Sequence, residues 1–276
     1  MNKTIVITGG TGGIGYAIAI ALAKQGNDII FQGRDTVKGQ QIAEELSKIN
    51  GTTARFIAAD VSSIAGMKDL AIAIKKLTNK IDILIQATGT LNSERRETKD
   101  GLYESFAVNY FCKFMLDYLL LDELKSGQGK IIIVGGPLRN QAVINFDDLH
   151  MKTNYSLMKS IGQNMLAIHM HVQEFSKRYG SSLAINVVNA GVVKTGIDRN
   201  VKGAMKLVFL ILGPIVSNSI EKAIVNVMAL VETNDQHSGY FYPKVARPAT
   251  KEKINLAADV ASKLWDESIK LGHLNL

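Results

Sequence analysis

Tyr155 and Lys159 are the residues best suited to proton chemistry, and they stand four apart in the stretch Tyr155-Ser156-Leu157-Met158-Lys159. In the helix predicted over residues 155–179, positions four apart share one face. An ammonium group beside a phenol favours the phenolate, which lowers the pKa of the phenol and lets it act as an acid or base nearer neutral pH. A tyrosine and a lysine at this spacing also occur often by chance, so the surrounding elements must decide.

A glycine-rich turn, Gly-Gly-Thr-Gly-Gly-Ile-Gly, occupies residues 9–15. Residues 3–8 before it are apolar and β-branched, as in a strand buried on both faces, and a helix is predicted over residues 16–25. The glycines permit a tight turn and close backbone approach, and the helix N-terminus offers N–H groups to a pyrophosphate. The sequence therefore predicts a dinucleotide cradle, with a purely structural turn as the alternative.

The remaining chain alternates strand and helix patterns. Strands are predicted at residues 3–8, 28–32, 54–59, 81–85, 130–134, 183–188 and 239–242. Helices are predicted at residues 16–25, 37–49, from 62 or 63 onward, 103–121, 155–179 and 219–231. This order predicts one doubly wound α/β domain over residues 1–276, with a mainly parallel central sheet and helices on both faces.

From Thr8 to about Ser268 the chain resembles the short-chain dehydrogenase/reductase family, in its retinol-dehydrogenase-like branch; the turn Thr8–Gly15 and the Tyr155–Lys159 pair carry the resemblance. It implies a Rossmann-type fold and hydride transfer between a nicotinamide cofactor and a carbonyl or alcohol, with Tyr155 as proton donor or acceptor. Lys159 would also hold the nicotinamide ribose. Asn109 would distort its helix and hold a water that relays protons to Lys159, although a satisfied core amide is the alternative.

The resemblance also implies the cofactor contacts. The full set is Gly9, Thr11, Gly13, Ile14, Gly15, Arg34, Asp60, Val61, Gly89, Tyr155, Lys159, Gly191, Val193 and Thr195. For Asp60 and Thr195 the structural alternative is that each acts as a helix N-cap.

The end of the second predicted strand indicates NADP(H) as the preferred cofactor, with NAD(H) possible. In the family pattern an acid that selects NAD would fall at Gly33, and the arginine of NADP-dependent members at Arg34. Asp35 would help to select NAD if the turn were one residue longer, and Lys38 would assist Arg34. A solvated loop residue is the alternative reading of Arg34.

The largest departure from the family is Gly136, which stands where a serine normally donates a hydrogen bond to the substrate carbonyl. Asn140, Gln141 and Thr153 are the candidates to replace that donor. Gln86-Ala87-Thr88 also replaces Asn-Asn-Ala, and Ala190 replaces a proline. Because of Gly136, reduction of an activated C=C bond is an alternative to carbonyl chemistry. A weakly catalytic cofactor-binding sensor or assembly protein is a third reading, which the Asn109, Tyr155 and Lys159 set argues against.

Composition and net charge limit the classes of molecule that this chain is expected to bind. The net charge of +7 comes without a basic block interleaved with aromatic residues, so a small-molecule substrate is expected and nucleic acid is not. A single cysteine, Cys112, fits a reducing cytoplasm. His169 and His171 stand two apart on a predicted helix and so should not share a metal.

A homo-oligomer and an apolar substrate are both compatible with the sequence. The resemblance implies a variable segment at about residues 196–218 that covers the substrate. Its apolar run, Leu207–Leu212, is too short to span a bilayer. Residues 203–216 would be a lid, a membrane-surface element or core packing.

Overall fold

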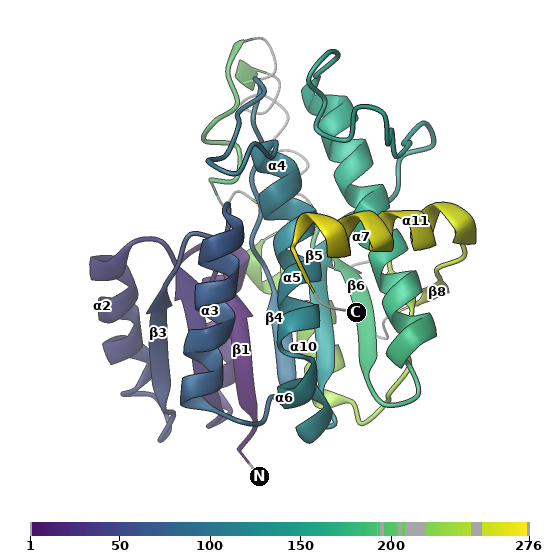
Figure 1. The fold of residues 1–276 in the computed structure, drawn as a ribbon. Coiled ribbons are helices and arrows are strands. Elements are labelled where there is room, and N and C mark those ends of the chain that lie inside the picture. The colour runs from purple at the N-terminus through teal and green to yellow at the C-terminus, as the bar shows by residue number, and fades with distance from the viewer. Residues whose placement is uncertain are drawn as a thin grey trace.

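A computed structural model describes residues 2–191, 193, 196–203, 206–207, 219–243 and 250–274. Its centre is one sheet with the strand order β3-β2-β1-β4-β5-β6-β7-β8, in which every neighbouring pair is parallel except β7 and β8 (Figure 1). The strands are β1 Thr4–Thr8, β2 Asp28–Gly33, β3 Ala54–Ala58, β4 Ile83–Gln86, β5 Lys130–Gly135, β6 Ala184–Asn189, β7 Tyr240–Tyr242 and β8 Glu252–Lys253. This confirms the predicted mainly parallel α/β fold.

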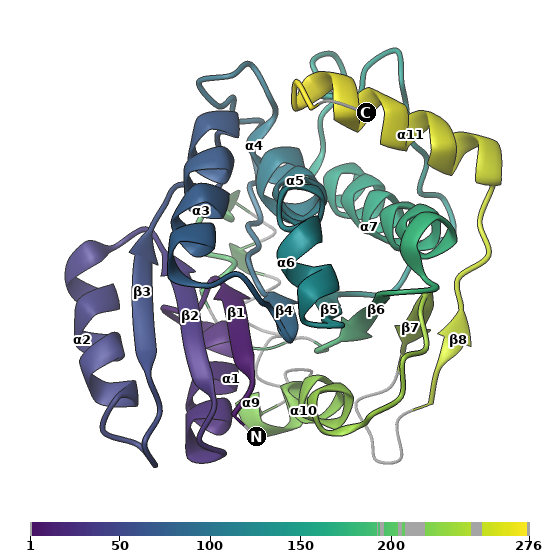
Figure 2. The ribbon, with the colours of Figure 1, turned by 60° about the horizontal axis from the view of Figure 1, so that its bottom comes forward.

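Helices cover both faces of the sheet. Figure 2 shows α3, α5, α6 and α7 on one face, with α11 lying across α7, and α1, α9 and α10 on the other. The helical bounds are α1 Gly13–Lys24, α2 Thr36–Leu46, α3 Ile64–Leu77, α4 Glu104–Phe106, a π-helical turn η1 Ala107–Phe111, α5 Cys112–Leu119, α6 Leu121–Ser126, α7 Leu157–Tyr179, α9 Ile220–Ala223, α10 Val225–Glu232 and α11 Ala258–Leu271.

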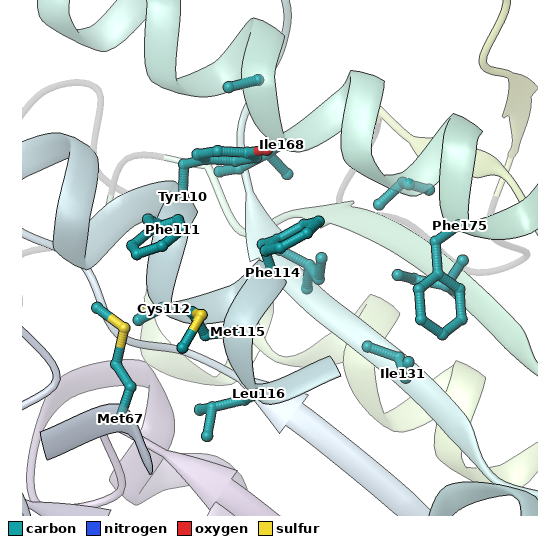
Figure 3. Close-up of a cluster of buried hydrophobic side chains, with 14 of the residues drawn as sticks. Met67, Tyr110, Phe111, Cys112, Phe114, Met115, Leu116, Ile131, Ile168 and Phe175 are labelled. Carbon is teal, nitrogen blue, oxygen red and sulfur yellow. The ribbon is translucent and has the colours of Figure 1, made fainter. Parts of the chain in front are cut away.

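Each face of the sheet has its own hydrophobic core, because successive side chains of a strand point to opposite faces. In β1, Val6 belongs to the core under α3, α5, α7 and α11, while Ile5 and Ile7 belong to the core over α1, α2 and α10. Figure 3 shows the first core, to which α5 contributes Phe114 and α7 contributes Phe175. The two cores fix the sheet, and with it the loops at the carboxyl ends of its strands.

The helices predicted over residues 16–25 and 37–49 are observed as α1 and α2 with bounds shifted by one to three residues, and three other predicted helices differ further. The helix predicted over residues 103–121 is distorted by η1 at Asn109, as the resemblance implies, but it also ends at Leu119, and α6 follows from Leu121. The helix predicted over residues 219–231 is divided at Ile224 into α9 and α10. The helix predicted from Tyr155 starts two residues later, since Ser156 is its N-cap and accepts a hydrogen bond from the Lys159 backbone N–H at 3.2 Å.

Residues 204–205 and 208–218 of the predicted substrate-covering segment lie outside the described residues. Within the described part of the chain, no helix is both long and apolar enough to cross a membrane.

Candidate active site

The glycine turn joins β1 to α1 and is tied to the end of β2. A Cβ on Gly15 would lie 2.3 Å from the Gly9 carbonyl oxygen, so only glycine permits this approach. Gly9 has a φ of 72° and donates to Gln32 Oε1 at 3.0 Å, which anchors the turn. Among the described residues no side chain caps the N-terminus of α1. The first backbone N–H groups of α1 therefore have no side-chain acceptor. Unpaired N–H groups at a helix N-terminus can bind a pyrophosphate.

The other predicted cofactor contacts in this turn are Thr11, Gly13 and Ile14. Gly13 has a φ of 54°, a conformation that favours glycine. Thr11 is half-buried against Gly33, and Ile14 packs against a small cluster made of Ala190, Val193 and Ala223.

The end of β2 leaves no room for an acid at Gly33. A Cβ there would lie 2.3 Å from Thr11 Cγ2. The next residue, Arg34, is exposed. Asp35 is the N-cap of α2 and accepts from the Lys38 backbone N–H at 3.0 Å, which uses its carboxylate locally. Lys38 Nζ would lie 3.8 Å from a Cβ on Gly12, so its charge stands beside the glycine turn.

Asp60 and Val61 follow β3. The Asp60 carboxylate is exposed and accepts from the Ser62 backbone N–H at 3.0 Å. The alternative that Asp60 caps the next helix is wrong, because the N-cap of α3 is Ser63, whose hydroxyl accepts from the Gly66 N–H at 3.1 Å. Val61 is buried.

Gly89 and Asn109 meet at the end of β4. A Cβ on Gly89 would lie 3.5 Å from Asn109 Oδ1 and 3.2 Å from Ile197 Cδ1. Asn109 lies within η1, and its amide exchanges two hydrogen bonds with the backbone of Thr90, at 2.8 and 2.9 Å. The helix is therefore distorted at the residue where the family resemblance implies it.

Tyr155 is not placed beside Lys159 as predicted. Tyr155 precedes the N-cap of α7, so the four-residue spacing does not put the two side chains on one helical face. The Tyr155 hydroxyl donates to the Asn92 carbonyl, and its ring meets Tyr103 edge-on at 5.8 Å. Lys159 is exposed.

The electrostatic expectation for Tyr155 is also wrong. Burial raises the pKa of Tyr155 above that of a free phenol, and hydrogen bonds with Ser160 and Ser105 only partly offset the rise. Because the ring is half-buried, desolvation of the phenolate outweighs the nearby donors. In this conformation Tyr155 is a weaker acid than the sequence predicted.

Gly136 follows β5, and its carbonyl contacts His169 Nε2 at 3.1 Å. Of the candidates to replace its missing hydroxyl, Asn140 and Gln141 are exposed, and the Thr153 hydroxyl donates to Asp148 Oδ2 at 2.6 Å. The Thr153 hydroxyl proton is therefore already used in this local bond.

After β6, Gly191 has a φ of 71° and donates to Asn189 Oδ1 at 2.8 Å, while Val193 is buried. Thr195 lies outside the described residues.

A buried polar residue that was not among the predicted ones, Asn92, connects three parts of the site. Its carbonyl accepts from Tyr155, its Oδ1 accepts from Asn200 at 2.9 Å, and its Nδ2 donates to Glu104 Oε2 at 3.0 Å. These partners are 12 to 108 residues away in sequence, so no local pattern could have indicated them.

Among the described residues, the predicted cofactor contacts that follow a strand, such as Gly9, Asp60 and Gly89, thus lie at the carboxyl ends of parallel strands, where ligands of open α/β sheets bind. Human retinol dehydrogenase 13 is 31% identical over 98% of this chain and 84% of its own length. Human polyprenol dehydrogenase is 28% identical over 98% of this chain and 85% of its own.

A short-chain dehydrogenase from Sphingobium yanoikuyae, solved in complex with NADPH, has the same fold, with a TM-score of 0.63, 20% identity and 85% coverage of both chains. The family profile described as short chain dehydrogenase matches residues 3–206. With a glycine cradle after β1, a π-helical turn at Asn109 and this match, the chain belongs to the short-chain dehydrogenase/reductase family of oxidoreductases, in which it resembles the retinol dehydrogenases.

Proposed function

We propose that this enzyme transfers hydride between an apolar alcohol or its carbonyl product and NADP(H), which it prefers to NAD(H). The observation that carries the cofactor preference is the end of β2, where Gly33 leaves no space for a carboxylate and exposed Arg34 follows. An arginine–phosphate pair is charge-assisted and often bidentate, so Arg34 suits the 2′-phosphate of NADP(H). Lys38 beside Gly12 adds a second positive charge.

The substrate class is supported by the relatives. Their names are retinol dehydrogenase 13 and polyprenol dehydrogenase, and retinol and polyprenols are long apolar alcohols. Because this chain matches both along 98% of its length, we propose the same broad class here.

The roles of the site residues follow from their positions. A bound nicotinamide would supply or accept the hydride. Tyr155 would move the proton at its phenolic oxygen, which must first leave the Asn92 carbonyl. Lys159 is the proposed contact for the nicotinamide ribose. Its exposed side chain on the first turn of α7 is free to reorient toward a bound cofactor. Asn109 would hold the relay water with its second Nδ2 hydrogen or its second Oδ1 lone pair, because its two bonds to Thr90 use only one of each.

The remaining cofactor contacts are proposed as a set. Asp60 and Val61 would meet the adenine, and Gly89 the ribose, and Gly191, Val193 and Thr195 would lie beside the nicotinamide. The cytoplasmic location and the homo-oligomer remain predictions.

Titration of NADPH and NADH tests the cofactor preference. Arg34→Ala should weaken NADPH binding by about tenfold to a hundredfold and leave NADH binding nearly unchanged, because only NADPH carries the 2′-phosphate. Arg55→Ala is the matched control, since exposed Arg55 lies on β3 opposite Ile30, away from the end of β2. Equal wild-type affinities for the two cofactors would overturn the preference.

Gly136 favours a second candidate, the reduction of an activated C=C bond, because that reaction needs no hydroxyl at this position. NADPH oxidation should be followed with apolar aldehydes and with enones. Turnover of enones alone would replace the carbonyl assignment.

A further inference from the structure

Lys113 of α5 is a buried cation that the proposed proton transfer does not use. Its side chain is 1% exposed, and its Nζ donates to the Thr88 carbonyl at 2.8 Å and to the Val108 carbonyl at 3.4 Å. A buried ammonium group is costly unless it is paired and hydrogen-bonded, so these two carbonyls determine where it can lie. Burial lowers the pKa of Lys113, and Asp117 is among the groups that oppose this change.

Lys113 forms the middle contact of a three-step ladder between the end of β4 and the η1–α5 helix. Gln86 Nε2 donates to Asp117 Oδ1, and Lys113 Nζ donates to the Thr88 carbonyl. Thr90 exchanges two hydrogen bonds with Asn109. The spacing of the ladder follows from the geometry of the two segments. Two residues of extended chain advance about 6.6 Å, and four residues of helix advance about 6 Å. Every second residue after the end of β4 therefore meets every fourth residue of the η1–α5 helix.

The far end of this ladder is fixed from a second helix. Asp117 Oδ2 lies 2.7 Å from Nε2 of His171, which belongs to α7. Gln86 and Thr90 therefore have their own anchors, whereas Lys113 is the side chain that holds the carbonyl of Thr88 between them.

Thr88 matters because its backbone rests directly on the glycine turn. A Cβ on Gly9 would lie 3.1 Å from the Thr88 nitrogen and from the Ala87 carbonyl group. A movement of the Thr88 peptide would thus disturb two backbone segments that are proposed to contact the cofactor, the glycine turn and Gly89.

We propose that Lys113 is a positioning residue, which holds the Thr88–Gly89 backbone against the glycine turn and thereby supports cofactor binding. Lys113 would act through the Thr88 carbonyl and touch neither cofactor nor substrate. The inference rests on the proposed function, because it assumes that this edge of the sheet binds a nicotinamide dinucleotide.

Lys113→Met tests the proposal, with Lys130→Met as its matched control. Lys130 is also a buried lysine that donates to two backbone carbonyls, those of Leu230 and Thr233, but it lies at the start of β5, at the opposite edge of the sheet. Both substitutions remove an ammonium group and keep most of the side-chain volume.

Direct titration should show that Lys113→Met raises the Kd for NADPH by about tenfold, while Lys130→Met leaves it within about twofold. Both variants should lower the thermal midpoint. At saturating NADPH, kcat of the Lys113 variant should stay near the wild-type value, because the proton donor is untouched. Amide exchange of residues 87–90 in the cofactor-free protein should accelerate only in Lys113→Met.

If Lys113→Met does not fold, Lys113→Gln keeps an N–H donor and should show an intermediate Kd. A Lys113 variant whose Kd and exchange rate match those of Lys130→Met would overturn the inference alone. A wild-type protein that binds neither NADPH nor NADH would overturn the proposed function as well.

Discussion

Tyr155 is the residue on which the proposed chemistry depends most directly. Tyr155→Phe removes the phenolic proton and the bond to the Asn92 carbonyl, but keeps the ring that packs edge-on against Tyr103. Turnover should fall by about a hundredfold to ten-thousandfold, the usual contribution of a positioned acid or base, with little change in NADPH affinity.

Tyr103→Phe is the control for this measurement, because it removes a neighbouring buried hydroxyl that contacts Ser160. Its turnover should fall by less than about tenfold, since Tyr103 is not the proposed proton donor. Full turnover of Tyr155→Phe on an identified substrate would require the mechanism to be withdrawn.

Gly136 is the residue at which the chain departs most from its family. A Cβ added there would meet Met165 Sδ at 3.5 Å, an ordinary contact, so a small side chain can begin at this position without a clash. If a donor to the substrate oxygen is missing, Gly136→Ser should raise turnover of simple ketones or aldehydes by about a hundredfold to a thousandfold.

Gly136→Ala is the matched control, because it adds the same Cβ without the hydroxyl. Steady-state rates of the two variants on one panel of carbonyls decide the matter. A serine variant no faster than the alanine variant would show that the missing hydroxyl does not limit the reaction.

At the scale of elements, contacts distant in sequence alter the helices that local patterns predict. Apolar periodicity predicts one helix over residues 103–121, but the Asn109 amide is fixed by the Thr90 backbone, and the helix widens into η1 around it. Ser156 similarly caps α7 and leaves Tyr155 outside it. At Asn109 and Ser156, therefore, a short polar side chain that binds backbone groups decides the local helix geometry.

The contact between α7 and the end of β5 predicts a pH dependence of stability. Burial lowers the pKa of His169 to about 4, although its contact with the Gly136 carbonyl opposes the change. The unfolded chain then binds a proton near pH 6.5 that the folded chain does not bind until about pH 4. The free energy of unfolding should therefore decline as pH falls through this window, with a contribution from His169 of about 2 to 3 kcal/mol at pH 4.5.

Urea unfolding of wild type and His169→Gln at pH 7 and pH 4.5 measures this contribution. Glutamine keeps an N–H donor for the Gly136 carbonyl but does not titrate, so the variant should lose less stability on acidification. An unchanged pH dependence in His169→Gln would contradict the assignment.

At the scale of the whole molecule, the parallel sheet is the feature best predicted from sequence. Strands such as β1 and β5 are continuous apolar runs, and burial on both faces requires that composition. The two-residue strand β8 was missed, because its exposed Glu252 and Lys253 show no hydrophobic pattern.

The candidate site likewise contains residues that the sequence could place and residues that it could not. Positions that follow a strand, such as Gly9 or Gly89, could be placed from motif order alone. The contacts that position Tyr155, above all the one with Asn92, depend on packing between segments distant in sequence. They could not be predicted from the sequence.

The packing of α11 across α7 can be used to test whether the chain unfolds as one domain. Trp265 of α11 is buried, meets Phe114 of α5 edge-on at 5.0 Å and stacks on His171 of α7 at 5.8 Å. Trp265→Ala should lower the free energy of unfolding by about 3 to 5 kcal/mol, because it leaves a cavity over the buried His171–Asp117 contact.

Urea unfolding followed by circular dichroism measures this loss, and Trp265→Phe, which fills most of the cavity, should cost less than about 1.5 kcal/mol. NADPH affinity should be retained in both variants, since the contacts of Trp265 are with α5 and α7 rather than with the cofactor edge. A single cooperative transition is expected, because α11 closes the core shared by α3, α5 and α7. Two separate transitions would instead show that α11 unfolds independently of the sheet, and the single-domain assignment would have to be revised.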